Sequence, residues 1–455
     1  MRLFGTDGIR GNAAKFPFDN NTLEIIGYAL AKNLNPSKSK KPFLILRDTR
    51  QSGARIEKAL AGGVIAAGSA IVSAGVLPTP AASVILKTAK NKYAGAVVIS
   101  ASHNPYQDNG IKIFGANGLK LSDATEAKIE KTIAAQFSKK TFKSSAKIKI
   151  KRDTALSKIY ENFIINLFSN ISLKGRTVVL DCANGAVFKI APKILKNLGA
   201  SVVAINNKPN GKNINVNCGA TKPEACAETV KKLISQGLSP LGLSFDGDGD
   251  RLICVDERGT VRDGDYYLAV MAKSLKANKQ LKANALVTTV MANIGLVKEM
   301  KAAKISLKLT KVGDRYVLEE MLRIKAALGG EQSGHIIFNN ILPTGDGLIA
   351  AVELIKHLVK NNTTLFKETQ SFQKYPQVLI NTKVAAKPPL DKLPKSKTVI
   401  KKFEKTYGDE GRVLVRYSGT ENLLRVMIEG KNISQIKKDA TTIAEIIASE
   451  IEETI

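Results

Sequence analysis

The sequence predicts an α/β fold made of several sheets, and three observations lead to this prediction. Short apolar runs of strand length alternate with helical patterns along most of the 455 residues, as in α/β units with parallel or mixed sheets. The run 94–100 is apolar up to its last residue, Ser100, as expected of a strand with both faces covered. A chain of this length is too long for one core and indicates about three domains.

The individual elements follow from the same patterns. We expect strands at 43–46, 94–100, 177–181, 201–205 and 241–245, another from 251, and helices at 53–67 and near 191–198. Strands at 412–416 and 423–429 and a helix at 433–451 suggest a different, α+β, domain at the end. Of two lysine-rich stretches, 146–151 suggests an edge strand guarded by lysines, and 385–402, with three prolines, suggests a loop.

Composition narrows the class of protein. Residues 59–86 carry no charge, but their glycines, prolines and alanines favour a buried helix, a strand and a Pro-Thr-Pro loop over a membrane span. The four cysteines lack C-x-x-C spacing, and the N-terminus lacks the apolar core of an export signal. We therefore expect reduced thiols, no zinc site and a cytoplasmic protein.

The net charge of +29 raises the question of a nucleic-acid partner. The excess is mostly lysine scattered along the chain, and no aromatic residues are interleaved with it to stack on bases. We assign the charge to solvated faces, with a secondary benefit in attracting an anionic substrate. Nucleic acid remains only a minor alternative.

Three carboxylates in Phe245-Asp-Gly-Asp-Gly-Asp-Arg251 predict a metal site. Neither a strand nor a helix would bring Asp246, Asp248 and Asp250 to one ion, so the segment must curl, which its two glycines permit. Oxygen ligands of this kind suit Mg²⁺. A calcium loop of EF-hand type is excluded because its sixth position, which must be glycine, is Arg251.

A serine follows the buried strand 94–100. Ser102 could be a nucleophile or an ordinary turn residue that bonds its own backbone. Its context favours the nucleophile, because His103, one of three histidines in the chain, is adjacent. The cation of Lys112, a few residues later, could neutralise a phosphate or help to deprotonate a hydroxyl.

Two further loops suggest ligand contacts. In Gly329-Gly-Glu-Gln-Ser-Gly-His335 the glycines allow a ligand to approach Glu331 and Ser333, although an ordinary turn explains the spacing equally well. Arg416-Tyr-Ser-Gly-Thr-Glu421 joins two strands and offers an anion-binding nest, with Arg416 and Arg425 as guanidinium forks for phosphate; a plain hairpin is the alternative.

Together these motifs resemble those of the α-D-phosphohexomutase family, over essentially the whole chain. Five short motifs occur in the family's order: Phe4-Gly-Thr-Asp-Gly-Ile-Arg-Gly11, Ser100-Ala-Ser-His-Asn-Pro105, Asp246-Gly-Asp-Gly-Asp-Arg251, Gly330-Glu-Gln-Ser-Gly-His335 and Arg416-Tyr-Ser-Gly-Thr-Glu421. The resemblance implies three α/β domains with mixed sheets and a smaller α+β C-terminal domain around a central cleft. We divide the chain at 1–152 (phosphoserine loop), 153–254 (metal loop), 255–368 (sugar loop) and 369–455 (phosphate-binding domain).

The resemblance also implies roles for individual residues. Ser102 would carry the phosphoryl group and, with the three aspartates, hold one Mg²⁺. The other positions lining the reaction site would be Arg10, His103, Lys112 and Arg251. Substrate contacts would come from Glu331, Ser333 and His335 for the sugar, and from Arg416, Ser418, Gly419, Thr420 and Arg425 for its other phosphate.

The implied reaction is the interconversion of glucosamine 6-phosphate and glucosamine 1-phosphate, on the route to cell-wall amino sugars. It would run through a phosphoserine enzyme and a bisphosphorylated sugar. The position of the first motif at the N-terminus and Gln332 favour glucosamine; mannose or glucose phosphate at the same site is the alternative. The expected partner is thus a small sugar phosphate, with no membrane, and a homodimer is left open.

Overall fold

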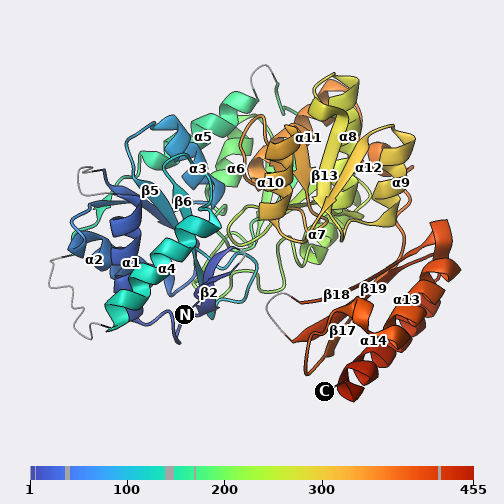
Figure 1. The fold of residues 1–455 in the computed structure, drawn as a ribbon. Coiled ribbons are helices and arrows are strands. Elements are labelled where there is room, and N and C mark those ends of the chain that lie inside the picture. The colour runs from blue at the N-terminus through green and yellow to red at the C-terminus, as the bar shows by residue number, and fades with distance from the viewer. Residues whose placement is uncertain are drawn as a thin grey trace. The chain divides into compact units, whose positions relative to one another are not determined.

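The computed structural model describes residues 2–5, 7–35, 41–138, 148–168, 171–418 and 422–454. These residues form four β-sheets, whose helices and strands are labelled in Figure 1. The chain divides into two compact units. The first comprises Met1–Val290 and Ile305–Thr369, and the second Met291–Lys304 and Gln370–Ile455. Three of the sheets belong to the first unit and the fourth to the second.

The first sheet has seven strands in the order β1-β2-β6-β5-β3-β4-β7. The strands are β1 (Phe4–Gly5), β2 (Gly8–Asn12), β3 (Phe43–Arg47), β4 (Ile71–Val76), β5 (Gly95–Ile99), β6 (Asp108–Gly115) and β7 (Lys151–Arg152). The four strands β5, β3, β4 and β7 run parallel, and β6, β2 and β1 are antiparallel to their neighbours. The sheet is therefore mixed, and the serine loop leaves β5 where β5 meets the antiparallel strand β6.

Helices cover both faces of this sheet. One face packs on α1 (Asn20–Leu34), α2 (Gly53–Ala66) and α4 (Asp123–Ser138), and α3 (Pro80–Thr88) packs against β5 from the other. Phe43 and Ile45 of β3 belong to the first core, and the alternate residues are equally buried. The helices α1 and α2 touch so closely that a Cβ at Gly63 would lie 1.8 Å from the carbonyl oxygen of Glu24.

The uncharged segment 59–86 lies inside this first domain. It contains the end of α2, then β4, then the start of α3, where Pro80 occupies the first turn. The expected order of buried helix, strand and Pro-Thr-Pro turn is thus confirmed. Across the described residues, every helix is too short or too polar to cross a bilayer.

The second sheet has the order β12-β11-β10-β8-β9. Its strands are β8 (Thr177–Asp181), β9 (Ser201–Ile205), β10 (Leu241–Phe245), β11 (Leu252–Val255) and β12 (Val261–Arg262), and its helices are α5 (Leu156–Leu167), α6 (Ile190–Asn197) and α7 (Glu224–Ile234). The strands β9, β8 and β10 are parallel, whereas β10 and β11 form an antiparallel hairpin. Cys226 and Val230 of α7 pack on Val179 and Val255 of the sheet.

The third sheet has the order β14-β13-β15-β16. Its strands are β13 (Ala285–Thr289), β14 (Ser306–Thr310), β15 (Leu328–Gly330) and β16 (Ile336–Phe338), with helices α8 (Gly264–Ala277), α10 (Asp314–Ile324), α11 (Gly347–Lys360) and α12 (Leu365–Thr369) and the 3₁₀ turn η1 (Lys282–Asn284). Val317 and Met321 of α10 pack on Ile337, whereas the next residue, Phe338, points the other way and meets Tyr267 of α8 edge to face.

The second unit is a three-stranded antiparallel sheet packed on helices. Its strands β17 (Gln377–Lys383), β19 (Leu423–Glu429) and β18 (Arg412–Tyr417) lie in that order, with α13 (Pro394–Tyr407) and α14 (Ile433–Glu453) and the 3₁₀ turns η2 (Leu390–Lys392) and η3 (Gly408–Glu410). The helix α9 (Ile294–Ala302) belongs to this unit, because Asn293 Nδ2 donates to the Tyr375 carbonyl oxygen at 2.9 Å. The expected α+β character of this region is confirmed.

One local expectation differs from the structure, and another can be compared with it only in part. The stretch 385–402 is not simply a loop, since α13 begins at Pro394 and buries Ser396 and Val399. The helix forms because the Glu450 carboxylate of α14 accepts the backbone N–H groups of Lys395 and Ser396 at its start. The expected edge strand at 146–151 lies partly outside the described residues. One edge of the first sheet is the two-residue strand β7, which begins at Lys151, and the other is β1.

Candidate active site

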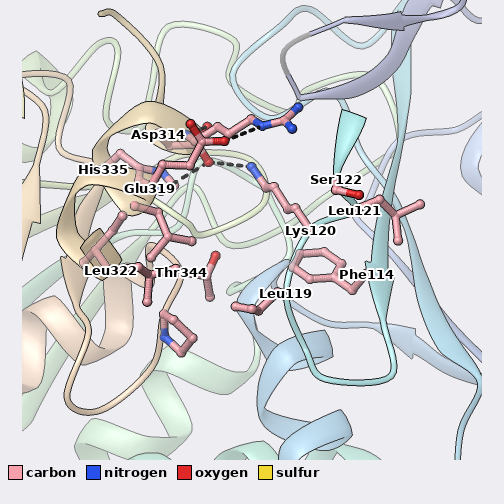
Figure 2. Close-up of a pocket in the computed structure, with 14 residues that line it drawn as sticks. Phe114, Leu119, Lys120, Leu121, Ser122, Asp314, Glu319, Leu322, His335 and Thr344 are labelled. Carbon is pink, nitrogen blue, oxygen red and sulfur yellow. Dashed lines mark hydrogen bonds and ion pairs between the residues drawn. The ribbon is translucent and has the colours of Figure 1, made fainter. Parts of the chain in front are cut away.

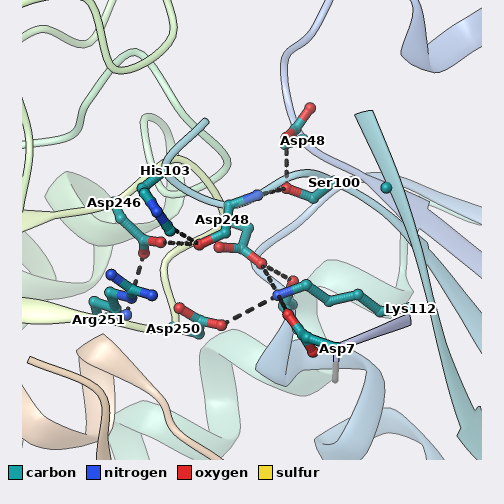
Figure 3. Close-up of polar contacts among 12 residues, drawn as sticks. Asp7, Asp48, Ser100, His103, Lys112, Asp246, Asp248, Asp250 and Arg251 are labelled. Atoms are coloured by element: carbon teal, nitrogen blue, oxygen red, sulfur yellow. Dashed lines mark hydrogen bonds and ion pairs between the residues drawn. The ribbon is translucent and has the colours of Figure 1, made fainter. Parts of the chain in front are cut away.

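The serine loop follows β5, all five residues of which are buried. Ser102 is 1% exposed, and its backbone is in the left-handed region with φ +52°. Its hydroxyl donates a hydrogen bond of 2.6 Å to Asp246 Oδ2, and His103 Nδ1 lies 3.4 Å from Ser102 Oγ. Two segments 144 residues apart in sequence thus meet at this hydroxyl, and Figure 3 shows His103, next to Ser102 in the chain, beside Asp246.

The carboxylate loop connects the two strands of the β10–β11 hairpin, whose last pair is Phe245 with Leu252. Asp246, Asp248 and Asp250 are all buried, and each offers an oxygen within 4.8 Å of the others. The loop curls back on itself with Gly249 at φ +71°, a conformation that favours glycine. Three oxygen donors of one charge gathered in this way could hold a metal ion.

The donor chemistry of these carboxylates fits a small hard cation. Asp248 Oδ1 and Asp250 Oδ1 are buried, and neither has a hydrogen-bond partner among the described residues. Burial, together with the charges of Asp250 and Asp248, raises the pKa of Asp246 well above its usual value. A divalent cation would give the two oxygens partners and relieve the repulsion among the carboxylates.

Lys112, on β6, brings a cation to the carboxylates. Its side chain is 1% exposed, and Nζ lies 2.9 Å from Asp248, 3.3 Å from Asp250 and 3.0 Å from Asp7 (Figure 3). Burial alone would lower the pKa of Lys112, but these three carboxylates raise it well above its usual value. The ammonium group therefore stays charged, and Arg10 contacts the same Asp7 at 2.5 Å.

The charges continue into a closed ring of alternating sign. From Lys112 the contacts run to Asp7, then to Lys120 at 2.5 Å, to Asp314 at the start of α10, to His335, and through Asp250 back to Lys112. The two imidazole contacts are longer, with His335 Nε2 3.6 Å from Asp314 and Nδ1 3.7 Å from Asp250. The ring joins residues of the first, second and third sheets.

The histidines of the site carry different charges. Burial lowers the pKa of His103 to about 4, and the nearby guanidinium groups of Arg251 and Arg10 add to the effect, so this imidazole is neutral at pH 7. Burial also opposes protonation of His335, but Asp250, Asp314 and Glu331 outweigh it and raise the pKa to about 9. His335 is therefore an imidazolium in the absence of a metal.

A cavity of about 200 Å³ lies beside the ring, next to Lys120, Asp314 and His335 (Figure 2). Its walls are mostly apolar and come from the first and third sheets: Phe114, Leu119, Leu121, Leu318, Leu322, Ile337 and Pro343. The Lys120–Asp314 ion pair lies at its polar end. This pair therefore links two domains of the first unit at the border of the site.

The loop between β15 and β16 is joined to the carboxylate loop through the backbone. Arg251 and His335 form an isolated antiparallel bridge, and Leu252 N–H donates to the Gly334 carbonyl oxygen at 2.9 Å. Glu331 Oε1 accepts the Gly313 N–H at 3.2 Å, and Ser333 is exposed. Burial raises the pKa of Glu331. The backbone of this loop is therefore hydrogen-bonded directly to the chain that leaves the carboxylate loop.

The second unit carries the other candidate residues. Arg416 of β18 and Arg425 of β19 are directly paired across the antiparallel strands. Burial lowers the pKa of Arg416, and the neighbouring positive charge of Arg425 lowers it further because like charges repel. Arg425 Nη2 lies 3.4 Å from Ser418 Oγ, and Lys387 Nζ donates to the Ser418 carbonyl oxygen at 2.9 Å. Gly419 and Thr420 lie outside the described residues.

The first unit thus brings most of the candidate residues together around Ser102 and the carboxylates, and the structure adds several that the motifs did not single out. They are Asp7, Asp48, Arg50, Thr79, Lys120 and Asp314. Thr79, from the Pro-Thr-Pro turn, donates through its hydroxyl to Asp248 and through its N–H to the Asp248 carbonyl oxygen. Asp7 lies in the first motif, Phe4–Gly11, for which the motif pattern points only to Arg10.

Comparison with family models places the chain. Residues 1–140, 156–259, 263–375 and 379–446 match, in turn, the α/β/α domains I, II and III and the C-terminal domain of phosphoglucomutase/phosphomannomutase. The chain therefore belongs to the phosphohexomutase family, and it is an isomerase. The predicted fold class, three α/β domains and a smaller C-terminal one, is confirmed.

Within this family the chain is similar to a particular group. It is 42% identical over 451 residues to a protein of Solibacter usitatus named phosphoglucosamine mutase, covering 99% of each chain. Among solved structures it matches a phosphoglucomutase/phosphomannomutase family protein of Burkholderia thailandensis, with a TM-score of 0.79 and 20% identity over 98% of this chain and 97% of that one.

A second solved structure adds a ligand-bound relative. It is the N-acetylphosphoglucosamine mutase of Aspergillus fumigatus in complex with GlcNAc-6P and magnesium. The TM-score is 0.65 with 17% identity, over 99% of this chain and 96% of that one. At these identities the two structures establish the likeness of fold.

Proposed function

We propose that the enzyme interconverts glucosamine 6-phosphate and glucosamine 1-phosphate, with Ser102 carrying the phosphoryl group between turnovers. The observation that carries the proposal is the 2.6 Å hydrogen bond from the buried Ser102 hydroxyl to Asp246, one of three clustered carboxylates. A nucleophilic oxygen beside a cation site suits phosphoryl transfer, which depends on positioning and charge. The name of the Solibacter usitatus relative supports glucosamine as the sugar.

The cation that we propose for this site is Mg²⁺, held by Asp246, Asp248 and Asp250 together with the oxygen on Ser102. When bound, it would stabilise negative charge on the transferred phosphoryl group. The donors are all oxygens, which suits a hard cation, and the Aspergillus fumigatus relative was crystallised with magnesium.

Positively charged side chains near the carboxylates would offset the negative charge of a phosphorylated Ser102 and of the substrate. A phosphorylated Ser102 would carry about −1.5 to −2 charges, which would repel a substrate that brings another phosphate. Lys112, Arg10 and Arg251 surround the carboxylates and offset this repulsion. His103 is neutral and can accept or donate a hydrogen bond without adding charge.

The reaction that we propose has two transfers. The bond between phosphorus and Ser102 Oγ breaks as phosphorus bonds to the free sugar hydroxyl, whose proton leaves to a base, and a sugar bisphosphate results. Its other phosphoryl group then returns to Ser102 Oγ, and the released sugar oxygen takes up a proton. Because atoms and charge balance over the cycle, no further reactant is consumed.

We also propose which residues contact the substrate, from the family motifs and from the positions of their loops. Glu331, Ser333 and His335, in the loop bridged to the carboxylate loop, would bind the sugar hydroxyl groups. In the second unit, the cross-strand pair Arg416 and Arg425 would bind the phosphate that is not being transferred. Ser418, Gly419 and Thr420 would complete that phosphate site, and Lys387 adds a further cation beside Ser418.

The test is a coupled assay of glucosamine, glucose and mannose phosphates side by side, with the intact mass of the purified protein. We expect the highest kcat/KM with glucosamine phosphate and a fraction of molecules heavier by one phosphoryl group. A preference for mannose or glucose phosphate would assign the same site to another sugar. Nucleic-acid binding that falls steeply with salt, without mutase activity, would refute the proposal.

The Ser102→Ala variant tests the nucleophile. It should lose nearly all mutase activity and the added mass while keeping the fold, as judged by circular dichroism and thermal unfolding. Ser157→Ala is a matched control, because its hydroxyl donates to the nearby Thr154 carbonyl oxygen at 2.8 Å. Full activity in Ser102→Ala would remove the serine from the mechanism.

We also propose that the enzyme works in the cytoplasm, which its four free, buried cysteines support. A homodimer stays a prediction, to be tested by sedimentation of the purified chain.

A further inference from the structure

The backbone of Ser102 is held in a conformation that a residue with a side chain rarely adopts. Its φ of +52° lies in the left-handed region, which is disfavoured because Cβ crowds the following carbonyl oxygen. Such a conformation persists only where the surrounding structure imposes it. The contacts that hold the two peptide groups of Ser102 therefore decide where its hydroxyl points.

Those contacts form a closed ring of hydrogen bonds. The Ser102 N–H donates to Ser100 Oγ at 2.9 Å, and the Ser100 hydroxyl donates to Asp48 Oδ2 at 2.6 Å (Figure 3). Arg50 Nε donates to the same Asp48 oxygen at 2.8 Å, and Arg50 Nη2 donates to the Ser102 carbonyl oxygen at 2.9 Å. The ring fixes the peptide groups on both sides of Ser102, and so fixes its φ and ψ.

The guanidinium group of Arg50 donates all of its hydrogen bonds to Asp48 and to backbone carbonyl oxygens of the serine loop and the start of β6. Besides Asp48 and the Ser102 carbonyl, it donates to the carbonyl oxygens of Asn104 at 2.8 Å, Asp108 at 3.1 Å and Pro105. The five N–H groups of a guanidinium are thus all occupied. Since its side chain is fully buried, Arg50 has no donor left for a phosphate and acts only on the backbone.

Two loops between elements of the second sheet and its helices also hold the Ser102 backbone. Asn215 Nδ2 donates to the Ser102 carbonyl oxygen at 2.9 Å and to that of Asn104 at 3.2 Å. Gly247 of the carboxylate loop lies so close that a Cβ there would be 2.6 Å from the Ser102 carbonyl oxygen. The carbonyl held by Arg50 is therefore also the point at which the serine loop packs against the carboxylate loop.

We infer that Arg50, held by Asp48, is a positioning residue for phosphoryl transfer: it fixes the backbone of Ser102 so that Oγ points at Asp246 both before and after phosphorylation. This inference rests on the proposed function. A lysine cannot replace the arginine, because one ammonium group cannot span four carbonyl oxygens and a carboxylate. Loss of the Arg50 guanidinium group should lower kcat and leave KM nearly unchanged, since Arg50 does not reach the substrate.

The experiment compares Arg50→Lys with the matched control Arg55→Lys. Arg55 also donates to backbone carbonyl oxygens, those of Phe18 at 2.9 Å and Ala13 at 2.6 Å, whereas the Ser102 and Asn104 carbonyl oxygens are bound by Arg50. We measure kcat, KM, thermal unfolding, and hydrogen exchange of the segment 100–110. Arg50→Lys should lower kcat by about 100-fold, as misplacing a reacting group by an ångström does, and should speed exchange in that segment.

The control should lose stability without losing kcat. Equal losses of kcat in both variants, or a kcat in Arg50→Lys within about threefold of wild type, would overturn the inference. If Arg50→Lys does not fold, Ser100→Ala opens the same ring at a smaller side chain and should show the same split between kcat and KM. Hydrogen exchange does not depend on the reaction, so it tests whether Arg50 fixes the Ser102 backbone even if the proposed substrate is wrong. An error in the proposed substrate would appear only in the assay of the wild-type enzyme.

Discussion

Gly345 packs flat against the imidazole of His335, and we predict that Gly345→Ala damages the site more than the fold. A Cβ at this position would lie 2.2 Å from His335 Nε2 and 2.4 Å from Cε1. Ordinary contact begins at 3.4 Å, so the ring would have to move by about 1.2 Å, the difference between the two distances. A movement of this size would disrupt the contacts of His335 with Asp250 and Asp314, with which it completes the charge ring.

The size of the effect follows from this displacement. A reacting or orienting group misplaced by about 1 Å costs roughly 100-fold in rate, and inserting a methyl group into a packed site costs about 1–3 kcal/mol of stability. We therefore expect kcat/KM for glucosamine phosphate to fall about 100-fold while the protein still unfolds cooperatively. The assays are the coupled mutase reaction and thermal unfolding of the same preparation.

Gly115→Ala is the matched control. Gly115 also lies in the first unit, at the end of β6, but the nearest atom to its Cβ would be Asn117 Oδ1, 3.1 Å away at the end of a side chain that can move. This variant should keep its activity within about twofold. Wild-type activity in Gly345→Ala would falsify the reasoning, because the ring would then have moved without consequence.

Three other perturbations have defined outcomes. Asp248→Asn should need more Mg²⁺ and lose roughly 100-fold or more in rate, whereas an unchanged metal requirement in the assay would remove this carboxylate from the site. Lys120→Met should cost about 1–2 kcal/mol in denaturant unfolding, because its ion pair with Asp314 is mostly buried. Lys395→Met, which removes an exposed ion pair with Glu453, should cost clearly less, and equal losses would contradict this. Burial raises the pKa of Asp346 to about 7, so the bound proton stabilises the folded protein fully below pH 4, and this stabilisation is lost as the pH rises through 7. Over this range the free energy of unfolding of the wild type should fall by up to about 4 kcal/mol relative to that of Asp346→Asn. Parallel curves of unfolding free energy against pH for the two proteins would refute this.

Much of the fold was predictable because it is encoded in local patterns. The strands 177–181, 201–205 and 241–245 coincide with β8, β9 and β10, since runs of apolar residues between turn residues specify strands wherever they pack. The stretch 385–402 misled because its prolines suggested a loop. The helix α13 is capped by Glu450, 55 residues away, which no local pattern reveals.

The sequence by itself determined the chemistry of this protein: a serine after a buried strand, three alternating carboxylates, and the motif order of a phosphohexomutase. Only the tertiary structure decided how that chemistry is held. Lys120 meets Asp314 across 194 residues, and Arg50 reaches the Ser102 carbonyl across 52. Such contacts cannot be predicted from the sequence, because lysine, arginine and aspartate are common along the whole chain. The packing of the sheets determines which of these side chains share a buried site, where they must pair because water cannot solvate them separately.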